Sequence, residues 1–170
     1  MKHKRNKNKG FTLLELIVGV AVFSLVIIIA TGLLAFSFRN QRKSIAIQNV
    51  SDNARYLIGF MAKEIRMSEI LTGDGQVYTL NLNHSTKGNI SYTFTGTQIM
   101  RDPDGPGPLS ASAINSDEVR VDGRFFIDGK GVDSEQPRVT IMMKVNTASA
   151  KPEEQSVINL QTTLSQRTLD

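Results

Sequence analysis

Glu15 is the residue whose type and position most strongly suggest chemistry. It lies at the start of an apolar run, and no charged residue follows it between Leu16 and Phe38, a stretch of 23 residues. A carboxylate inside a membrane-length apolar segment is energetically costly, so its usual interpretation is a functional one with a defined partner. The alternative is that Glu15 lies shallowly enough in a membrane to reach the headgroups. These residues alone leave both interpretations open.

The remaining residues that could act in catalysis do not form a recognisable site. His3 lies before the apolar run, and His84 lies in an expected loop. A strand would direct the neighbouring side chains of Asp117 and Glu118 to opposite faces, which makes them a poor catalytic pair. The chain has no cysteine, which excludes disulfides, thiol catalysis and Cys-ligated zinc or iron–sulfur sites. We therefore predict a non-enzyme without a metal or a cofactor.

Residues 101–108 form the strongest loop signal in the chain, since they contain several Pro and Gly residues. Their Asp102-Pro103-Asp104-Gly105 segment is similar to the start of a calcium loop, but the later ligands and the closing Glu of an EF-hand are missing. A plain turn is the favoured interpretation, and calcium binding at 102–105 is left open.

The positive charge of the chain is confined to its N-terminal tip. The sequence has 20 Lys and Arg against 16 Asp and Glu, and five of the basic residues lie among the first ten. Without those ten residues, 15 basic residues face 16 acidic ones. We therefore predict no direct binding of nucleic acid, although a local basic surface patch is left open.

The apolar run has the length of one membrane-spanning helix, since about 20 apolar residues cross the hydrocarbon core. The basic tip before it predicts a cytoplasmic N-terminus and places the rest of the chain on the opposite side of the membrane. A secretory signal peptide is the weaker alternative. Its apolar stretch would have only about 7–15 residues and would end in a small-x-small cleavage site, whereas residues 35–39 read Ala-Phe-Ser-Phe-Arg.

The segment Lys9-Gly10-Phe11-Thr12-Leu13-Leu14-Glu15-Leu16-Ile17 resembles the class III signal of type IV prepilins and pseudopilins. In that family a membrane prepilin peptidase cuts after the glycine and methylates the new N-terminal residue. The resemblance implies cleavage between Gly10 and Phe11 and N-methylation of Phe11. It also implies that Glu15 pairs with the N-terminal amine of a neighbouring subunit during filament assembly.

The physical chemistry of this segment agrees with the resemblance. Cleavage after Gly10 removes all five leader charges and leaves one cationic amine at Phe11. In apolar surroundings an unpaired charge on either the amine or Glu15 is unfavourable, so pairing would give both attraction and register. Phe11 and Glu15 are also four residues apart, so a pair within one chain is the alternative.

The resemblance extends to an expected function, partners and location. Residues 51–71 are similar to the post-anchor helix of J-type or W-type minor pseudopilins, which implies a minor structural subunit serving pilus biogenesis, type II secretion or DNA uptake. The implied partners are other pilin-like subunits, the prepilin peptidase, the inner-membrane assembly platform and the lipid bilayer. The implied location is the inner membrane, crossed once, or the cell surface within a pilus. A single-pass membrane protein whose external β-domain binds a ligand is the alternative.

Hydrophobic periodicity predicts the elements that position this segment. A helix is expected from residue 11 to about residue 70, and Gly73 and Gly75 are expected to end it. Its second half carries an apolar stripe with three- and four-residue spacing. The stripe consists of Ile47, Val50, Ala54, Leu57, Met61 and Ile65, with Ile58 beside it.

Beyond Gly75 the hydrophobic period changes to two, which predicts half-buried strands in an antiparallel sheet with one covered face. The predicted fold is α+β, a pilin-like roll with one long helix packed on the sheet. The expected divisions are a cleaved leader over 1–10, the transmembrane and assembly half of the helix over 11–38, its amphipathic half over 39–72, and an extracytoplasmic β-rich part of the same globular domain over 73–170.

Overall fold

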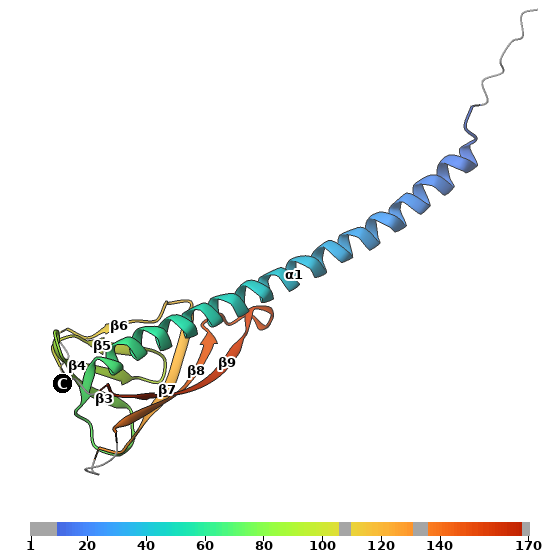
Figure 1. Cartoon of the computed structure of the whole chain (residues 1–170). Coiled ribbons are helices and arrows are strands. Elements are labelled where there is room, and N and C mark those ends of the chain that lie inside the picture. The colour runs from blue at the N-terminus through green and yellow to red at the C-terminus, as the bar shows by residue number, and fades with distance from the viewer. Residues whose placement is uncertain (1–9, 106–109, 131–135, 168–170) are drawn as a thin grey trace, which may run out of the picture. The chain divides into compact units, whose positions relative to one another are not determined.

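A computed structural model describes residues 10–105, 110–130 and 136–167 of the chain (Figure 1). The expected leader, apart from Gly10, and Pro106 to Pro108 of the expected loop therefore lie outside the described residues. The chain divides into two compact units, Met1–Gln41 and Arg42–Asp170. Helix α1 (Leu13–Arg66) contributes residues to both units.

In the first unit, α1 is an uninterrupted apolar helix. Every described residue from Gly10 to Gln41 is exposed. The most apolar 18-residue window of α1 has a mean hydropathy of 2.9, and α1 is long and apolar enough to cross a membrane. The hydroxyls of Ser24 and Thr31 donate to Val20 O at 2.8 Å and Ile27 O at 3.0 Å. These bonds let polar side chains occupy an apolar helix, because each hydroxyl has a partner within the helix itself.

In the described part of the second unit, nine strands form two antiparallel sheets. The five-stranded sheet has the order β1-β3-β4-β5-β6, and the four-stranded sheet has the order β2-β7-β8-β9. The strands are β1 (Ser68–Ile70), β2 (Gly75–Val77), β3 (Thr79–His84), β4 (Gly88–Phe94), β5 (Ile99–Asp102), β6 (Ser112–Ala113), β7 (Val119–Asp128), β8 (Arg138–Thr147) and β9 (Val157–Ser165). The α+β fold with one long helix packed on antiparallel strands is confirmed, although two sheets replace the expected single one.

The two sheets meet where β4 approaches β7. The rings of Phe94 and Phe125 pack with their centroids 4.8 Å apart. A Cβ atom on Gly123 would lie 2.5 Å from Met142 O and 2.8 Å from the Phe94 ring. Only a residue without a side chain fits between the sheets at this point.

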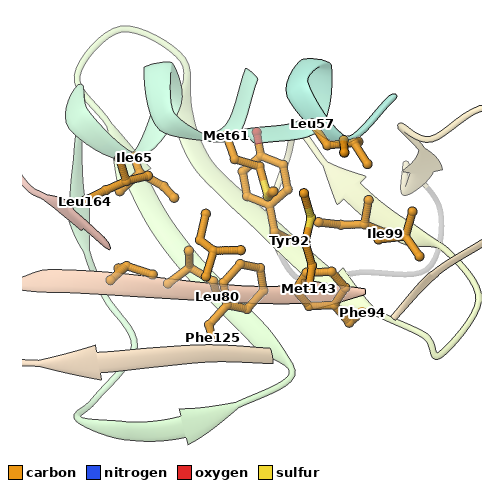
Figure 2. Packing of buried hydrophobic residues seen from close by; sticks show 14 of the residues in the cluster. Leu57, Met61, Ile65, Leu80, Tyr92, Phe94, Ile99, Phe125, Met143 and Leu164 are labelled. Atoms are coloured by element: carbon orange, nitrogen blue, oxygen red, sulfur yellow. The ribbon is translucent and has the colours of Figure 1, made fainter. Parts of the chain in front are cut away.

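The apolar stripe of α1 forms one wall of the core, as predicted, with one exception. Val50, Ala54, Leu57, Met61 and Ile65 are all buried. Figure 2 shows Leu57, Met61 and Ile65 directed from the helix towards side chains of the strands, among them Leu80, Tyr92 and Phe125. The inclusion of Ile47 in the stripe was wrong, since it is 44% exposed while Ala46 is buried. Ala46 lies four and eight residues before Val50 and Ala54, so it continues their face of the helix.

The helix ends earlier than its hydrophobic pattern predicted. It ends at Arg66, and Ser68–Ile70 forms strand β1, which pairs with β3. The hydroxyl of Ser68 donates to Glu64 O at 2.6 Å, which satisfies a carbonyl of the last turn. The backbone N–H of Ile70 donates to Gln166 Oε1 at 3.1 Å. Gly73 and Gly75 therefore do not end the helix, because tertiary hydrogen bonds stabilise an extended backbone before them.

Candidate processing and assembly site

The peptide bond between Gly10 and Phe11 is accessible in the structure. Both residues precede the first turn of α1, and neither belongs to a helix or strand. Gly10 is exposed, and a Cβ atom built on it would have no neighbour within 4 Å. The side chain of Phe11 is 88% exposed. Among the described residues, none packs against Gly10, and the bond expected to be cleaved is open to another protein from their side.

Thr12 and Glu15 together form the N-terminal cap of α1. The Thr12 hydroxyl oxygen accepts a hydrogen bond from Glu15 N–H at 3.3 Å. In return, Glu15 Oε2 accepts from Thr12 N–H at 3.0 Å and from the Thr12 hydroxyl at 2.9 Å. This reciprocal arrangement is a capping box, which satisfies backbone donors that a helix start otherwise leaves without partners.

The capping box adds a third role for Glu15 to the two that the apolar run suggests. The sequence suggests a partner amine or a shallow position in the membrane, whereas the structure brings the carboxylate to Thr12. The signal was present, because Thr12-x-x-Glu15 fits the pattern of a capping box before an apolar run. A capping role does not exclude pairing with an amine, since a carboxylate has about four acceptor positions.

The other sequence candidates are not brought together. Asp117 and Glu118 lie in a turn before β7 rather than in a strand, so the prediction of opposite strand faces was wrong. The Glu118 carboxylate accepts from Asn49 Nδ2 at 2.8 Å. His84 is the last residue of β3 rather than part of the expected loop, and its Nδ1 accepts from Thr86 N–H at 3.2 Å. The Glu118 contact links the turn before β7 to α1, whereas the His84 contact lies within the turn that follows β3.

In the calcium candidate, Asp102 Oδ1 accepts from Asp104 N–H at 3.1 Å and also from the Ser110 hydroxyl. Asp102 therefore stabilises its own turn. Within residues 10–105, 110–130 and 136–167, no three His, Cys, Asp or Glu side chains form a group that could hold a metal ion.

A buried ion cluster around Glu64 was not predicted from the sequence. The Glu64 side chain is 3% exposed, and the Arg101 guanidinium on β5 donates to it through Nε and Nη2, both at 2.9 Å. Lys87 Nζ donates to Glu64 Oε1 at 2.6 Å, and the Tyr92 hydroxyl donates to Oε2. The cluster thereby connects the last turn of α1 to β4, to β5 and to the turn between β3 and β4.

The position of Glu64 on the helix could have revealed this cluster. It lies three residues after Met61 and seven after Leu57, so it belongs to the buried face of α1. A charge on a buried face requires an opposite charge and hydrogen bonds. Sequence periodicity identified that face, but it could not show which distant residue supplies the cation.

The cluster keeps its charges at neutral pH. Burial raises the pKa of Glu64, but the hydrogen bonds from Arg101, Lys87 and Tyr92 outweigh burial and lower that pKa to about 2. Burial, followed by the hydrogen bond to Glu64, raises the pKa of Tyr92. The hydrogen bond to Glu64 raises the pKa of Arg101. The carboxylate is therefore ionised while Arg101 and Tyr92 keep their protons.

We expect this cluster to make the stability of the second unit sensitive to acid. Because the folded-state pKa of Glu64 lies below its ordinary value of 4.5, the stabilisation is fully present above about pH 4.5 and is lost as the pH falls through about 2. The shift corresponds to at most about 3 kcal/mol. Urea unfolding of the full chain in detergent between pH 7 and pH 2 measures it. The stability difference between wild type and Glu64→Gln should shrink over this range, and a constant difference would contradict the assignment.

Comparisons with known proteins bear on the N-terminal segment. Residues 5–31 match the family model described as the prokaryotic N-terminal methylation motif. A search of curated proteins and a search of solved structures found no match. The matched region contains Gly10, Phe11, the capping box and the first turns of α1. The match confirms the resemblance seen in the sequence, and the chain therefore carries the class III signal of a type IV pilin-like or pseudopilin-like precursor.

Proposed function

We propose that the chain is a structural subunit, a minor pilin or pseudopilin, of a type IV pilus-like filament. The observation that carries the proposal is an exposed Gly10–Phe11 bond directly before an apolar helix whose first turn contains Glu15. The methylation motif over residues 5–31 supports the same assignment. The filament would serve pilus biogenesis, type II protein secretion or DNA uptake.

The proposed sequence of events follows from the charges near the N-terminus. The precursor inserts with its basic tip on the cytoplasmic side and with the second unit across the membrane. Prepilin peptidase hydrolyses the Gly10–Phe11 peptide bond, and the new amine of Phe11 is methylated. The subunit then leaves the bilayer through the assembly platform and packs its apolar helix against those of neighbouring subunits. Apolar side chains of α1 lose their lipid contacts and gain protein contacts in this step.

Glu15 would give this packing its register. The mature N-terminus carries a positive charge, and Glu15 carries a negative one four residues further along the chain. Between neighbouring helices, the two charges can pair only at one relative displacement. Because both lie in apolar surroundings, any other displacement leaves each charge without a partner. The pair therefore selects one arrangement of adjacent subunits.

Mass spectrometry of the mature N-terminus tests the proposal. The full chain is expressed in cells with an active prepilin peptidase and in a matched strain without it. We expect a chain that begins with N-methylated Phe11 in the first strain and with the uncut leader in the second. Uncut chain in both strains would refute the proposal and would favour the alternative of a membrane-anchored protein with a ligand-binding external domain.

A further inference from the structure

Strand β9 forms an unusually long free edge of the second unit. It is the last strand in the order β2-β7-β8-β9 and has nine residues (Figure 1). The other three sheet edges are β1 and β2 with three residues each and β6 with two. Short edges are one way in which proteins avoid unwanted strand pairing. Among the described residues, β9 alone offers an edge long enough to bind a further strand.

The composition of β9 does not protect this edge. Its sequence, Val-Ile-Asn-Leu-Gln-Thr-Thr-Leu-Ser, contains no charged residue and no proline. Its pairing with β8 runs without interruption from Val157 opposite Asn146 to Ser165 opposite Arg138, so no bulge twists the strand away. Charged residues, proline and bulges are the usual protection of edge strands. The edge of β9 has none of the three.

The hydrogen-bond pattern shows which backbone groups of β9 have no partner among the described strands. Thr147 N–H donates to Ser156 O at 3.1 Å, and Gln166 N–H donates to Pro137 O at 3.0 Å, at the two ends of the ladder. In an antiparallel ladder, hydrogen-bonded residue pairs alternate with pairs that are not hydrogen-bonded. The even-numbered residues of β9 are therefore the ones whose backbone groups bond to β8. The odd-numbered residues, from Val157 to Ser165, therefore direct their N–H and C=O groups away from the sheet.

The side chains of β9 define what could pair with it. On the inner face, Ile158 and Leu160 pack against the core but are only half-buried, because no strand lies beyond them. On the outer face, Asn159, Gln161 and Thr163 are exposed and uncharged. An added strand would cover Ile158 and Leu160 with its own apolar side chains and place uncharged polar ones beside Gln161. The matching strand alternates between these two kinds of residue.

We propose that the edge of β9 binds an extended segment of a different subunit as a fifth strand of this sheet, antiparallel to β9. The segment is uncharged, has about the length of β9, and alternates apolar and polar side chains. This mode of recognition takes its affinity from main-chain hydrogen bonds and its specificity from alternate side chains. The inference rests on the proposed function, because a filament brings different pilin-like subunits together.

A second copy of this chain does not fit as an antiparallel partner. Antiparallel pairing of β9 with β9 creates a twofold axis perpendicular to the sheet. The stretches of α1 that lie on the two joined sheets would then run in opposite directions, whereas subunits anchored in one membrane share one direction. The remaining edges of a second copy, β1, β2 and β6, have at most three residues each. None of these can fill the nine-residue edge of β9.

Amide hydrogen exchange resolved to single residues tests the proposal. The full chain is labelled for short times in the membranes of its native host and, separately, as purified protein in detergent. In the purified protein only the even-numbered amides of β9 should be protected. In native membranes the odd-numbered amides, such as those of Gln161 and Thr163, should exchange at least about 100-fold more slowly, because a new strand accepts their hydrogen bonds. Equal exchange in the two samples would overturn the proposal.

Two substitutions at Gln161 provide a matched pair. Gln161→Pro removes an N–H that points away from β8, so it should leave the sheet folded while preventing the new strand from pairing. Gln161→Ala keeps that N–H and should retain the protection of Thr163 in native membranes. Protection of Thr163 that survives Gln161→Pro would contradict strand addition. Protection of the odd-numbered amides in the concentrated purified chain would instead identify a second copy as the partner and refute our assignment.

The N-terminus of the same membrane samples separates this inference from the proposed function. A methylated Phe11 together with unprotected odd-numbered amides would refute strand addition and leave the filament assignment intact. An uncut leader would refute the filament assignment, whatever the exchange at β9.

Discussion

Replacement of Glu64 by Gln should lower the free energy of unfolding of the second unit by about 3–5 kcal/mol. The substitution leaves the guanidinium of Arg101, whose side chain is 16% exposed, without a carboxylate. In addition, the side-chain NH2 group of glutamine is a hydrogen-bond donor, and it would face one of the groups that now donate to Glu64. With an m-value of about 1.5 kcal/mol per molar urea, the midpoint should fall by about 2–3 M. Urea unfolding of the full chain in detergent measures this.

Glu69→Gln is the matched control for this prediction. Glu69 lies in β1 with an exposed side chain, and its replacement should change stability by less than about 0.5 kcal/mol. Combining Glu64→Gln with Arg101→Met removes both buried charges. The double variant should therefore be less destabilised than the sum of the two single variants. An unchanged free energy of unfolding in Glu64→Gln would show that the cluster makes no net contribution to stability.

Replacement of Glu15 by Val should leave cleavage intact and reduce incorporation into filaments at least about tenfold, the effect of losing roughly 1.4 kcal/mol of pairing between subunits. Cleavage depends on the Gly10–Phe11 bond, which the substitution does not touch. Assembly would lose the partner of the Phe11 amine. Mass spectrometry of the mature N-terminus measures cleavage. The amount of subunit recovered in sheared or cross-linked filaments measures incorporation.

Glu15→Gln separates the two roles of this residue. Glutamine can replace glutamate in a capping box, so the bonds with Thr12 are kept while the charge is lost. If the charge is needed for pairing, Glu15→Gln should assemble as poorly as Glu15→Val. Wild-type assembly of Glu15→Gln would mean that Glu15 acts only as a cap, and that the proposed pairing with the amine is wrong.

Local patterns in the sequence determined the N-terminal segment, the fold class and most of the helix face of the core. The class III signal and the apolar span are contiguous, so no distant residue is needed to recognise them. The three- and four-residue spacing from Val50 to Ile65 identified the buried face of α1, since that spacing follows from helix geometry alone. The period of two beyond Gly75 predicted strands with one buried face, and β7 alternates between buried and exposed residues over most of its length.

Only the tertiary structure decided where α1 ends, how the strands divide between two sheets, and how Glu64 is neutralised. Each of these depends on residues far apart in the chain. Ile70 bonds to Gln166, Phe94 packs where Gly123 leaves room, and Glu64 pairs with Arg101. The free edge of β9 likewise depends on strand order, which hydrophobic period does not encode. A local pattern records which side of an element is buried, whereas its partner is chosen by packing, hydrogen bonding and charge across the whole unit.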